Sequence, residues 1–165
     1  MMRRLSIAAA FLLLAARATA APVVMTGKVI HVADGDTLTV LDGQNIKHKI
    51  RLEGIDAPEH KQAFGSKSRL ALVALALEKQ ASVSVIGQDR YGRELGRVTV
   101  DGVDINLRLV HDGMAWHFVK YAPNDKALAA AESEARLAKR GLWADAHPVA
   151  PWDWRKSEAD KRKSR

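Results

Sequence analysis

The chain has 165 residues, 47% hydrophobic and 27% charged, with a formal net charge of +7. It has no cysteine, which excludes disulfides, zinc–thiolate sites and thiol catalysis. Its length accommodates one domain with a modest core, and its basic balance favours a polyanionic partner.

The first twenty residues have the pattern of an export signal. Two arginines precede an apolar stretch from Leu5 to Ala16, and Ala18-Thr-Ala20 is a small-x-small cleavage site. The stretch is shorter than the about 20 residues that cross a bilayer. A buried N-terminal helix is the alternative, but it leaves the arginines and the cleavage site unexplained. We predict a signal peptide over residues 1–20, and a secreted or periplasmic protein with no membrane segment after cleavage.

Five segments have the composition of β-strands. They run from Val23 to Ala33, Thr37 to Leu41, Lys47 to Ile55, Ala81 to Ile86 and Leu95 to Val100. Gly27 inside the first segment predicts a bulge or a bend. The turn Asp42-Gly-Gln-Asn45 joins the second and third segments, so the first three predict an antiparallel meander.

Three segments have helical spacing. They run from Lys67 to Lys79, from Asp104 or Asn106 to Val110, and from Lys126 to Arg140. Ser66 can cap the first, which is rich in Leu and Ala nearly all round and is expected to be well buried. Asn124-Asp125 caps the last, which Gly141 ends.

This order of strands and helices predicts an α+β, mainly β domain over residues 21–145. The closest architecture is a five-stranded OB-fold barrel with about three helices. Residues 146–165 contain a run of basic side chains. This tail can hold nucleic acid, or it can be a disordered, solubilising end, which is the interpretation we assign to it.

Carboxylates and an arginine gather where two of the predicted strands end. If the hairpin is centred between Gly43 and Gln44, Asp36 lies opposite Arg51, within a register slip of one or two positions. Asp56 then follows just past the end of the neighbouring strand. Two carboxylates, a backbone carbonyl and waters form an oxygen shell suited to Ca²⁺, which takes roughly 6 to 8 ligands.

Residues next to this cluster suit phosphodiester chemistry. Pro58 holds Ala57 in extended geometry, which orients the Ala57 carbonyl, and Glu59 can face the pocket without binding the metal. Glu59 is then placed to deprotonate a metal-polarised water. Each residue alone is more often structural, since Asp-Gly-Asp is a common turn.

A later loop, Asp89-Arg-Tyr-Gly-Arg93, carries two more guanidinium groups at Arg90 and Arg93. An arginine offers a planar fork of donors that matches two phosphate oxygens. One arginine on each side of a metal-bound phosphate would neutralise the charge that develops in the transition state.

At these residues the chain closely resembles the staphylococcal nuclease (thermonuclease) family. The resemblance extends over roughly residues 26–143. The matching pieces are Asp34-Gly-Asp36-Thr, Arg51 with Asp56-Ala-Pro58-Glu59, Asp89-Arg-Tyr-Gly-Arg93, Asn106 to Gly113 with Met114-Ala-Trp116, and Gly141-Leu-Trp143. It implies an OB-fold endonuclease that uses calcium to hydrolyse DNA and RNA with little sequence preference and leaves 3′-phosphate ends.

The resemblance also implies a role for individual residues. Asp36, Asp56 and the Ala57 carbonyl would bind calcium, Arg51 and Arg93 would contact the scissile phosphate, and Glu59 would be the base. Arg90, Tyr91 and Tyr121 would bind the substrate. The chain departs from the family pattern at Arg90 and Val119 and in a shorter loop after Glu59. It is expected to act as a monomer.

Two alternatives give the same cluster another function. A non-catalytic OB module would bind single-stranded nucleic acid or a protein without turnover, and would be favoured had any of Asp36, Arg51, Glu59 or Arg93 been replaced. An exported calcium-binding structural protein is the other alternative, and it leaves the paired arginines unexplained.

Overall fold

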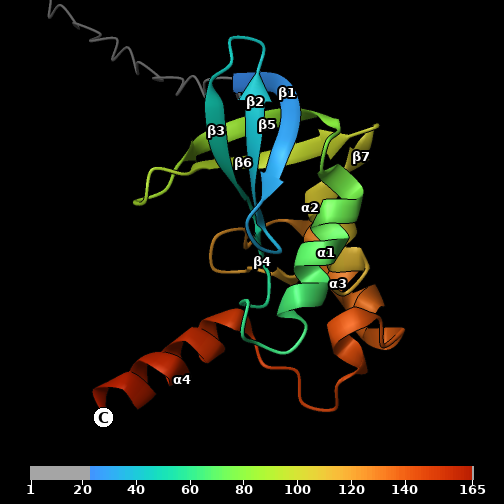
Figure 1. Cartoon of the computed structure of the whole chain (residues 1–165). Coiled ribbons are helices and arrows are strands. Elements are labelled where there is room, and N and C mark those ends of the chain that lie inside the picture. The colour runs from blue at the N-terminus through green and yellow to red at the C-terminus, as the bar shows by residue number, and fades with distance from the viewer. Residues whose placement is uncertain (1–22, 165) are drawn as a thin grey trace, which may run out of the picture.

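Strands with buried apolar positions close a small barrel in the computed structural model, which describes residues 23–164 (Figure 1). The predicted signal peptide therefore lies outside the described residues. The barrel strands are β1 (Val23–Val32), β2 (Thr37–Asp42), β3 (Lys47–Leu52), β5 (Gln80–Gln88) and β6 (Glu94–Val100). They follow the order β3-β2-β1-β5-β6, and parallel pairing of β3 with β6 closes the barrel. This confirms the predicted five-stranded, OB-like barrel.

Three shorter strands extend this framework. They are β4 (Ile55–Asp56), β7 (Val103–Asp104) and β8 (Trp116–His117). β4 pairs with β8 below the barrel (Figure 1), and β7 pairs antiparallel with the end of β6. The single strand predicted from Lys47 to Ile55 is thus divided into β3 and β4 by a turn at Glu53 and Gly54.

Two details of the predicted strands are corrected. Thr37, and not Asp36, lies opposite Arg51, a slip of one position from the centred hairpin. The irregularity in β1 falls between Val29 and His31. Gly27 has a different role, because a Cβ atom there would overlap the neighbouring strand's backbone.

Four α-helices occur among residues 23–164, one more than predicted. They are α1 (Gly65–Ala76), α2 (Ile105–His111), α3 (Lys126–Leu137) and α4 (Pro151–Lys163), with a short 3₁₀ helix at Gly141–Ala144. The side chains of Asp104 and Asp125 cap α2 and α3 by accepting from backbone amides in the first turn. Ser66 does not cap α1, which begins after Phe64. Leu70 on α1 is 59% exposed, so this helix is buried on one side only.

Two apolar clusters fill the interior. The larger one joins the barrel interior to α1 and α2 through side chains such as Leu38, Ile50 and Leu72. The smaller one gathers Trp116, Leu142 and Trp143 between α3 and the start of α4. No helix in the described part of the chain is both long and apolar enough to cross a membrane.

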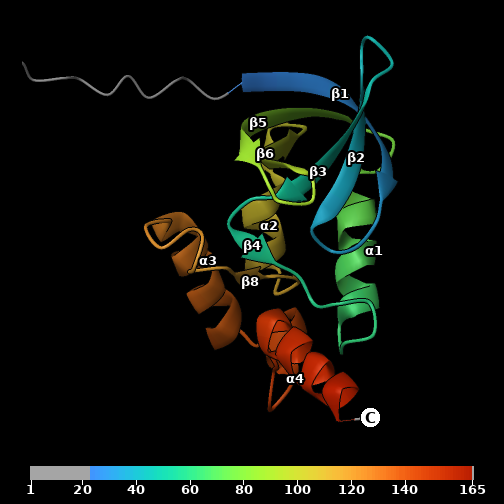
Figure 2. The same ribbon diagram turned by 90° about the vertical axis from the view of Figure 1, so that its left-hand side faces the viewer.

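Helix α4 stands where the sequence predicted disorder, so that prediction is wrong for residues 151–163. Pro151 is buried in its first turn. Trp152 stacks on Phe118 with ring centroids 5.1 Å apart and meets Trp116 edge to face at 5.5 Å. The charged half of α4 extends away from the rest of the molecule (Figures 1 and 2). Aromatic packing therefore fixes one end of a helix whose other end is solvated.

His48 on β3 spans the seam that closes the barrel. Its ring nitrogens lie 2.9 Å from Glu94 on β6 and 3.1 Å from Asp42 on β2. The hydrogen bond to Glu94, and to a smaller extent the one to Asp42, raises the pKa of His48 above its usual 6.5. The stabilisation by protonated His48 is therefore complete below that value and is lost as pH rises through the higher pKa of the folded state.

We predict that His48→Gln lowers the free energy of unfolding by about 0.5–1 kcal/mol at about pH 6 and by less at about pH 9. Urea unfolding at both pH values measures the difference. His31→Gln, at an exposed position on β1, is the control. An equal loss at both pH values would contradict the role assigned to the charged imidazole.

Candidate active site

Asp36 lies at the start of β2 in a turn that its own sequence builds. Its amide donates to the Asp34 carboxylate at 3.1 Å, which closes the turn. Gly35 packs so tightly against Ala57 and Ser68 that a Cβ atom would overlap both. The Asp36 carboxylate is thereby buried, where Oδ2 accepts from the Ala57 amide at 2.7 Å.

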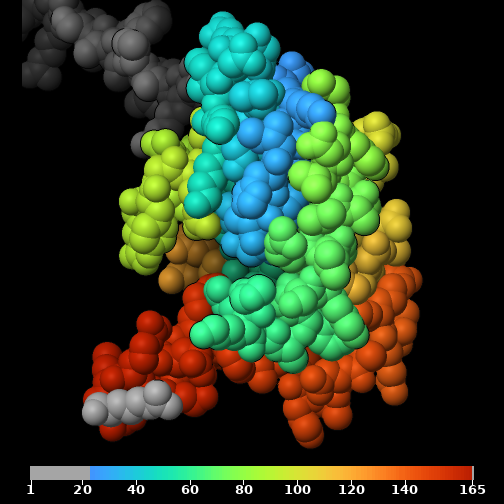
Figure 3. Space-filling view, viewed as in Figure 1, coloured from blue at the N-terminus to red at the C-terminus, as the bar shows by residue number. Residues whose placement is uncertain are grey.

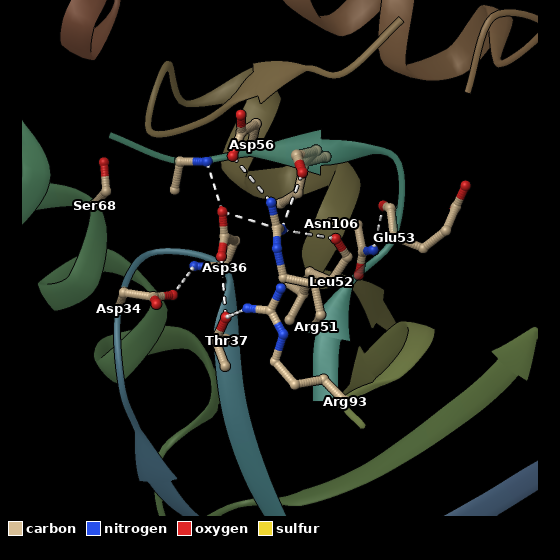
Figure 4. Close-up of polar contacts among 12 residues, drawn as sticks. Asp34, Asp36, Thr37, Arg51, Leu52, Glu53, Asp56, Ser68, Arg93 and Asn106 are labelled. Carbon is tan, nitrogen blue, oxygen red and sulfur yellow. Dashed lines mark hydrogen bonds and ion pairs between the residues drawn. The ribbon is translucent and has the colours of Figure 1, made fainter. Parts of the chain in front are cut away.

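Arg51 on β3 joins the two buried aspartates. Its guanidinium lies 3.0 Å from Asp36 Oδ2 and 3.0 Å from Asp56 Oδ1 (Figure 4). It also donates to the carbonyls of Leu52 at 3.1 Å and Ile55 at 3.0 Å. These carbonyls fix the plane of the guanidinium. Arg51 thereby joins the start of β2, the end of β3 and β4 in one charged cluster.

Asn106 holds the turn that carries the chain from Arg51 to Asp56. Its side chain is fully buried and donates to the carbonyls of Glu53 at 2.9 Å and Gly96 at 3.2 Å. It also accepts from the Val98 amide at 3.1 Å. Of the two residues that the sequence offers as a cap for this helix, Asp104 caps α2, and Asn106 ties the turn to β6.

The two aspartates leave negative charge that one arginine does not fully compensate. Burial raises the pKa of Asp36 to about 7; Arg51 opposes this shift, and the carboxylates of Asp34 and Asp56 add to it. A further cation at this position would stabilise the ionised carboxylates. The donor set consists of hard oxygens, which suits Ca²⁺.

The protein supplies only part of a metal shell. Among residues 23–164, no three His, Asp, Glu or Cys side chains form a ready metal cage. The predicted ligands are two carboxylates and the Ala57 carbonyl, so water or a substrate phosphate must complete the shell. The residues present fit a hard cation that binds weakly by itself.

Arg93 reaches the same place from the loop between β5 and β6. Its guanidinium lies 3.4 Å from the Thr37 hydroxyl, which itself donates to Asp36 at 3.1 Å. Asp89 holds Arg93 through a side-chain contact of 2.7 Å and accepts its amide at 3.0 Å. Figure 4 shows both guanidinium groups directed toward the start of β2. The structure therefore brings together Arg51 and Arg93, which lie far apart in the sequence.

Glu59 is connected to the cluster through a residue that sequence reasoning missed. Arg155 on α4 donates to Glu59 at 2.8 Å and to both carboxylate oxygens of Asp56, at 3.2 and 2.7 Å. Burial alone would lower the pKa of Arg155, but hydrogen bonds to Asp56 and Glu59 raise it. The available sequence signal was Pro151 and the two tryptophans beside Arg155, which are unusual in a disordered tail.

The predicted substrate-binding residues lie at the surface. Tyr91 and Tyr121 are 69% and 68% exposed. Arg90 donates to the Tyr91 hydroxyl at 2.7 Å and lies over its ring, while Tyr121 meets Phe118 edge to face. Arg93 also lies over the Tyr91 ring, at 5.8 Å from its centroid, so Tyr91 is next to one of the two site arginines. Both tyrosine rings are open to solvent.

Comparison with known proteins identifies the relatives of the chain. A protein-family model described as "Staphylococcal nuclease homologue" matches residues 49–145. An "Uncharacterized endonuclease" of Escherichia coli O157:H7 is 45% identical over 130 residues, which cover 78% of this chain and 84% of that protein. A "Micrococcal nuclease" of Shigella flexneri is 39% identical over 166 residues, which cover 88% of this chain and 94% of that protein.

We predict that Asn106→Ala lowers the free energy of unfolding by about 2–3 kcal/mol, because it removes the side-chain partner of the Glu53 carbonyl and of the Val98 amide. The Gly96 carbonyl keeps its hydrogen bond from the Glu53 amide. Chemical denaturation measures the loss. Asn124→Ala, at an exposed position before α3, is the matched control and should change the stability little. A loss no larger than that of the control would show that Asn106 does not hold this turn.

Proposed function

Because the chain is a nuclease that belongs to the staphylococcal nuclease family, we propose that it hydrolyses phosphodiester bonds in DNA and RNA with little sequence preference. The products would carry 3′-phosphate ends. The observation that carries this proposal is the cluster in which Arg51 joins Asp36 to Asp56. Arg93 is connected to the Asp36 carboxylate through the Thr37 hydroxyl.

Calcium is the proposed metal. Asp36, Asp56 and the Ala57 carbonyl would hold it, since they offer hard oxygens and the two aspartates share the single inner guanidinium of Arg51. Bound there, the ion would polarise a phosphate oxygen and lower the pKa of a water. The Ala57 amide and the Thr37 hydroxyl orient the Asp36 carboxylate before any ligand binds.

Arg51 and Arg93 would bind the scissile phosphate. Arg51 is only 13% exposed and its guanidinium is held by backbone carbonyls, so little rotamer freedom remains to be lost. Arg93 is held by Asp89 and is 25% exposed. Two oriented guanidinium groups neutralise the charge that accumulates on a pentacoordinate phosphorus.

Glu59 would accept the proton of the attacking water. It follows Pro58 at the mouth of the cluster, and its side chain is 42% exposed, so water has access to it. Tyr91 and Tyr121, both exposed, would stack on bases beside the scissile phosphate.

The export pattern of residues 1–20 supports a place of action outside the cytoplasm, in the periplasm or beyond it. We propose that the mature chain acts there as a monomer.

We predict that the mature protein releases acid-soluble nucleotides from DNA and from RNA with calcium and not with a chelator. Glu59→Gln should lower the rate about 10²- to 10⁴-fold through loss of the base. Arg93→Ala should lower it about 10²- to 10³-fold through loss of transition-state stabilisation.

Two remote variants are matched controls for this assay. Glu78→Gln and Arg108→Ala change exposed side chains of other ion pairs and should retain the wild-type rate. Circular dichroism checks that all four variants are folded. Near-wild-type activity of both Glu59→Gln and Arg93→Ala would refute the assignment of the active site.

Direct metal binding gives a separate prediction. Asp36→Asn and Asp56→Asn should each weaken calcium binding at least about tenfold, because each removes a charged ligand. Isothermal titration of the substrate-free protein measures the affinity. Asp101→Asn, in an exposed turn, is the control. Unchanged affinity in both site variants would place the calcium elsewhere.

A further inference from the structure

Helix α4 brings a guanidinium group onto the proposed metal site. Arg155 Nη2 lies 2.7 Å from Asp56 Oδ2, and Nη1 lies 3.2 Å from Asp56 Oδ1 and 2.8 Å from Glu59 Oε1. The side chain of Asp56 is 1% exposed and that of Arg155 is 44% exposed. An arginine from the surface thus covers a buried carboxylate.

The two oxygens of Asp56 are divided between two arginines. Arg51 donates to Oδ1, and Arg155 donates to both Oδ1 and Oδ2. A cation that is to be ligated by Asp56 needs one of these oxygens. Two positive groups that bind the same carboxylate repel each other. Since Arg51 is fixed by the backbone on the inner side, Arg155 is the group that can leave.

We propose that Arg155 is a built-in competitor of the metal, which occupies Asp56 and Glu59 in the metal-free enzyme and is displaced when Ca²⁺ binds. Helix α4 is then an autoinhibitory element, because the same guanidinium engages a metal ligand and the base. The inference rests on the proposed function, specifically on calcium binding at Asp36 and Asp56.

The way α4 is anchored suits this role. Trp152, three residues before Arg155, stacks on Phe118. The side-chain amide of Gln62 donates to the Val149 carbonyl, just before α4, at 2.6 Å. Trp154 and Pro58 line the same small pocket. These contacts hold α4 under the loop that carries Glu59, and the space-filling view shows the surfaces of loop and helix in contact (Figure 3).

The anchoring of α4 affects both the position and the movement of the Arg155 side chain. It keeps the Arg155 guanidinium at a high effective concentration beside Asp56. The helix does not have to detach when the metal binds, because the long arginine side chain can swing toward solvent from a fixed backbone. The displaced guanidinium stays near the site.

A second interpretation of the same contacts is that Arg155 positions Glu59 and assists the metal site. A third is that Arg155 forms a stabilising ion pair with no influence on metal binding. The three interpretations differ in the sign of the effect of Arg155 on calcium affinity, which makes this affinity the decisive measurement.

The test is isothermal titration of the substrate-free mature protein with calcium, comparing wild type with Arg155→Gln and Lys156→Gln. The two variants remove one positive charge from adjacent positions of α4, and Lys156 is exposed. Competition predicts that Arg155→Gln binds calcium about tenfold more tightly or better. Lys156→Gln should change the affinity by no more than about twofold, because salt screens an exposed charge.

Thermal unfolding with and without calcium gives a readout that does not depend on turnover. Arg155→Gln should melt below wild type in chelator, because Asp56 loses a partner, and calcium should raise its melting temperature more than that of wild type. Equal calcium affinities and equal calcium-induced shifts in the two proteins would overturn the inference. Weaker calcium binding by Arg155→Gln would also overturn it, in favour of a positioning role.

These outcomes are separate from failure of the proposed function. If neither wild type nor Arg155→Gln binds calcium, the proposed metal site is wrong, and the proposed competition between Arg155 and calcium is wrong with it. If both bind calcium and Asp56→Asn does not, the metal site stands and the comparison of affinities alone decides the role of Arg155.

Discussion

The contact of Arg51 with Asp36 and Asp56 is the constraint on which the candidate site depends. Two buried carboxylates this close to each other repel unless a positive group lies between them. Arg51 supplies that charge from β3, while the backbone carbonyls of Leu52 and Ile55 keep it in place. One arginine does not neutralise two aspartates, so the barrel holds a polar centre that favours an additional cation.

The rest of the fold supports this centre. Closure of the barrel by β3 and β6 brings the loop of Arg93 beside β2, and Asn106 fixes the turn that returns the chain to Asp56. Helix α4 then delivers Arg155 as the additional cation. The same excess of carboxylate charge supports the proposed metal site, and it explains why the guanidinium of Arg155 lies against Asp56.

Much of this was accessible from the sequence, and the failures have physical causes. The strands flanking Asp42-Gly-Gln-Asn45 and the cap at Asp125 follow from local turn and capping preferences, and both are present. The hairpin register was off by one, because loop geometry and not composition sets it. Arg155 was missed because 96 residues separate it from Glu59 and no local pattern encodes that contact.

The sequence by itself determined the five barrel strands, three of the four helices and the list of charged residues near Asp36, because propensities, turn residues and motif spacing are local properties. Only the tertiary structure decided which charges meet. It placed Arg51 between the aspartates, joined Arg93 to Asp36 through Thr37, and turned an apparently disordered tail into a helix that reaches Asp56. The physical reason is that pairing of buried charges depends on distances between segments that fold together from remote parts of the chain.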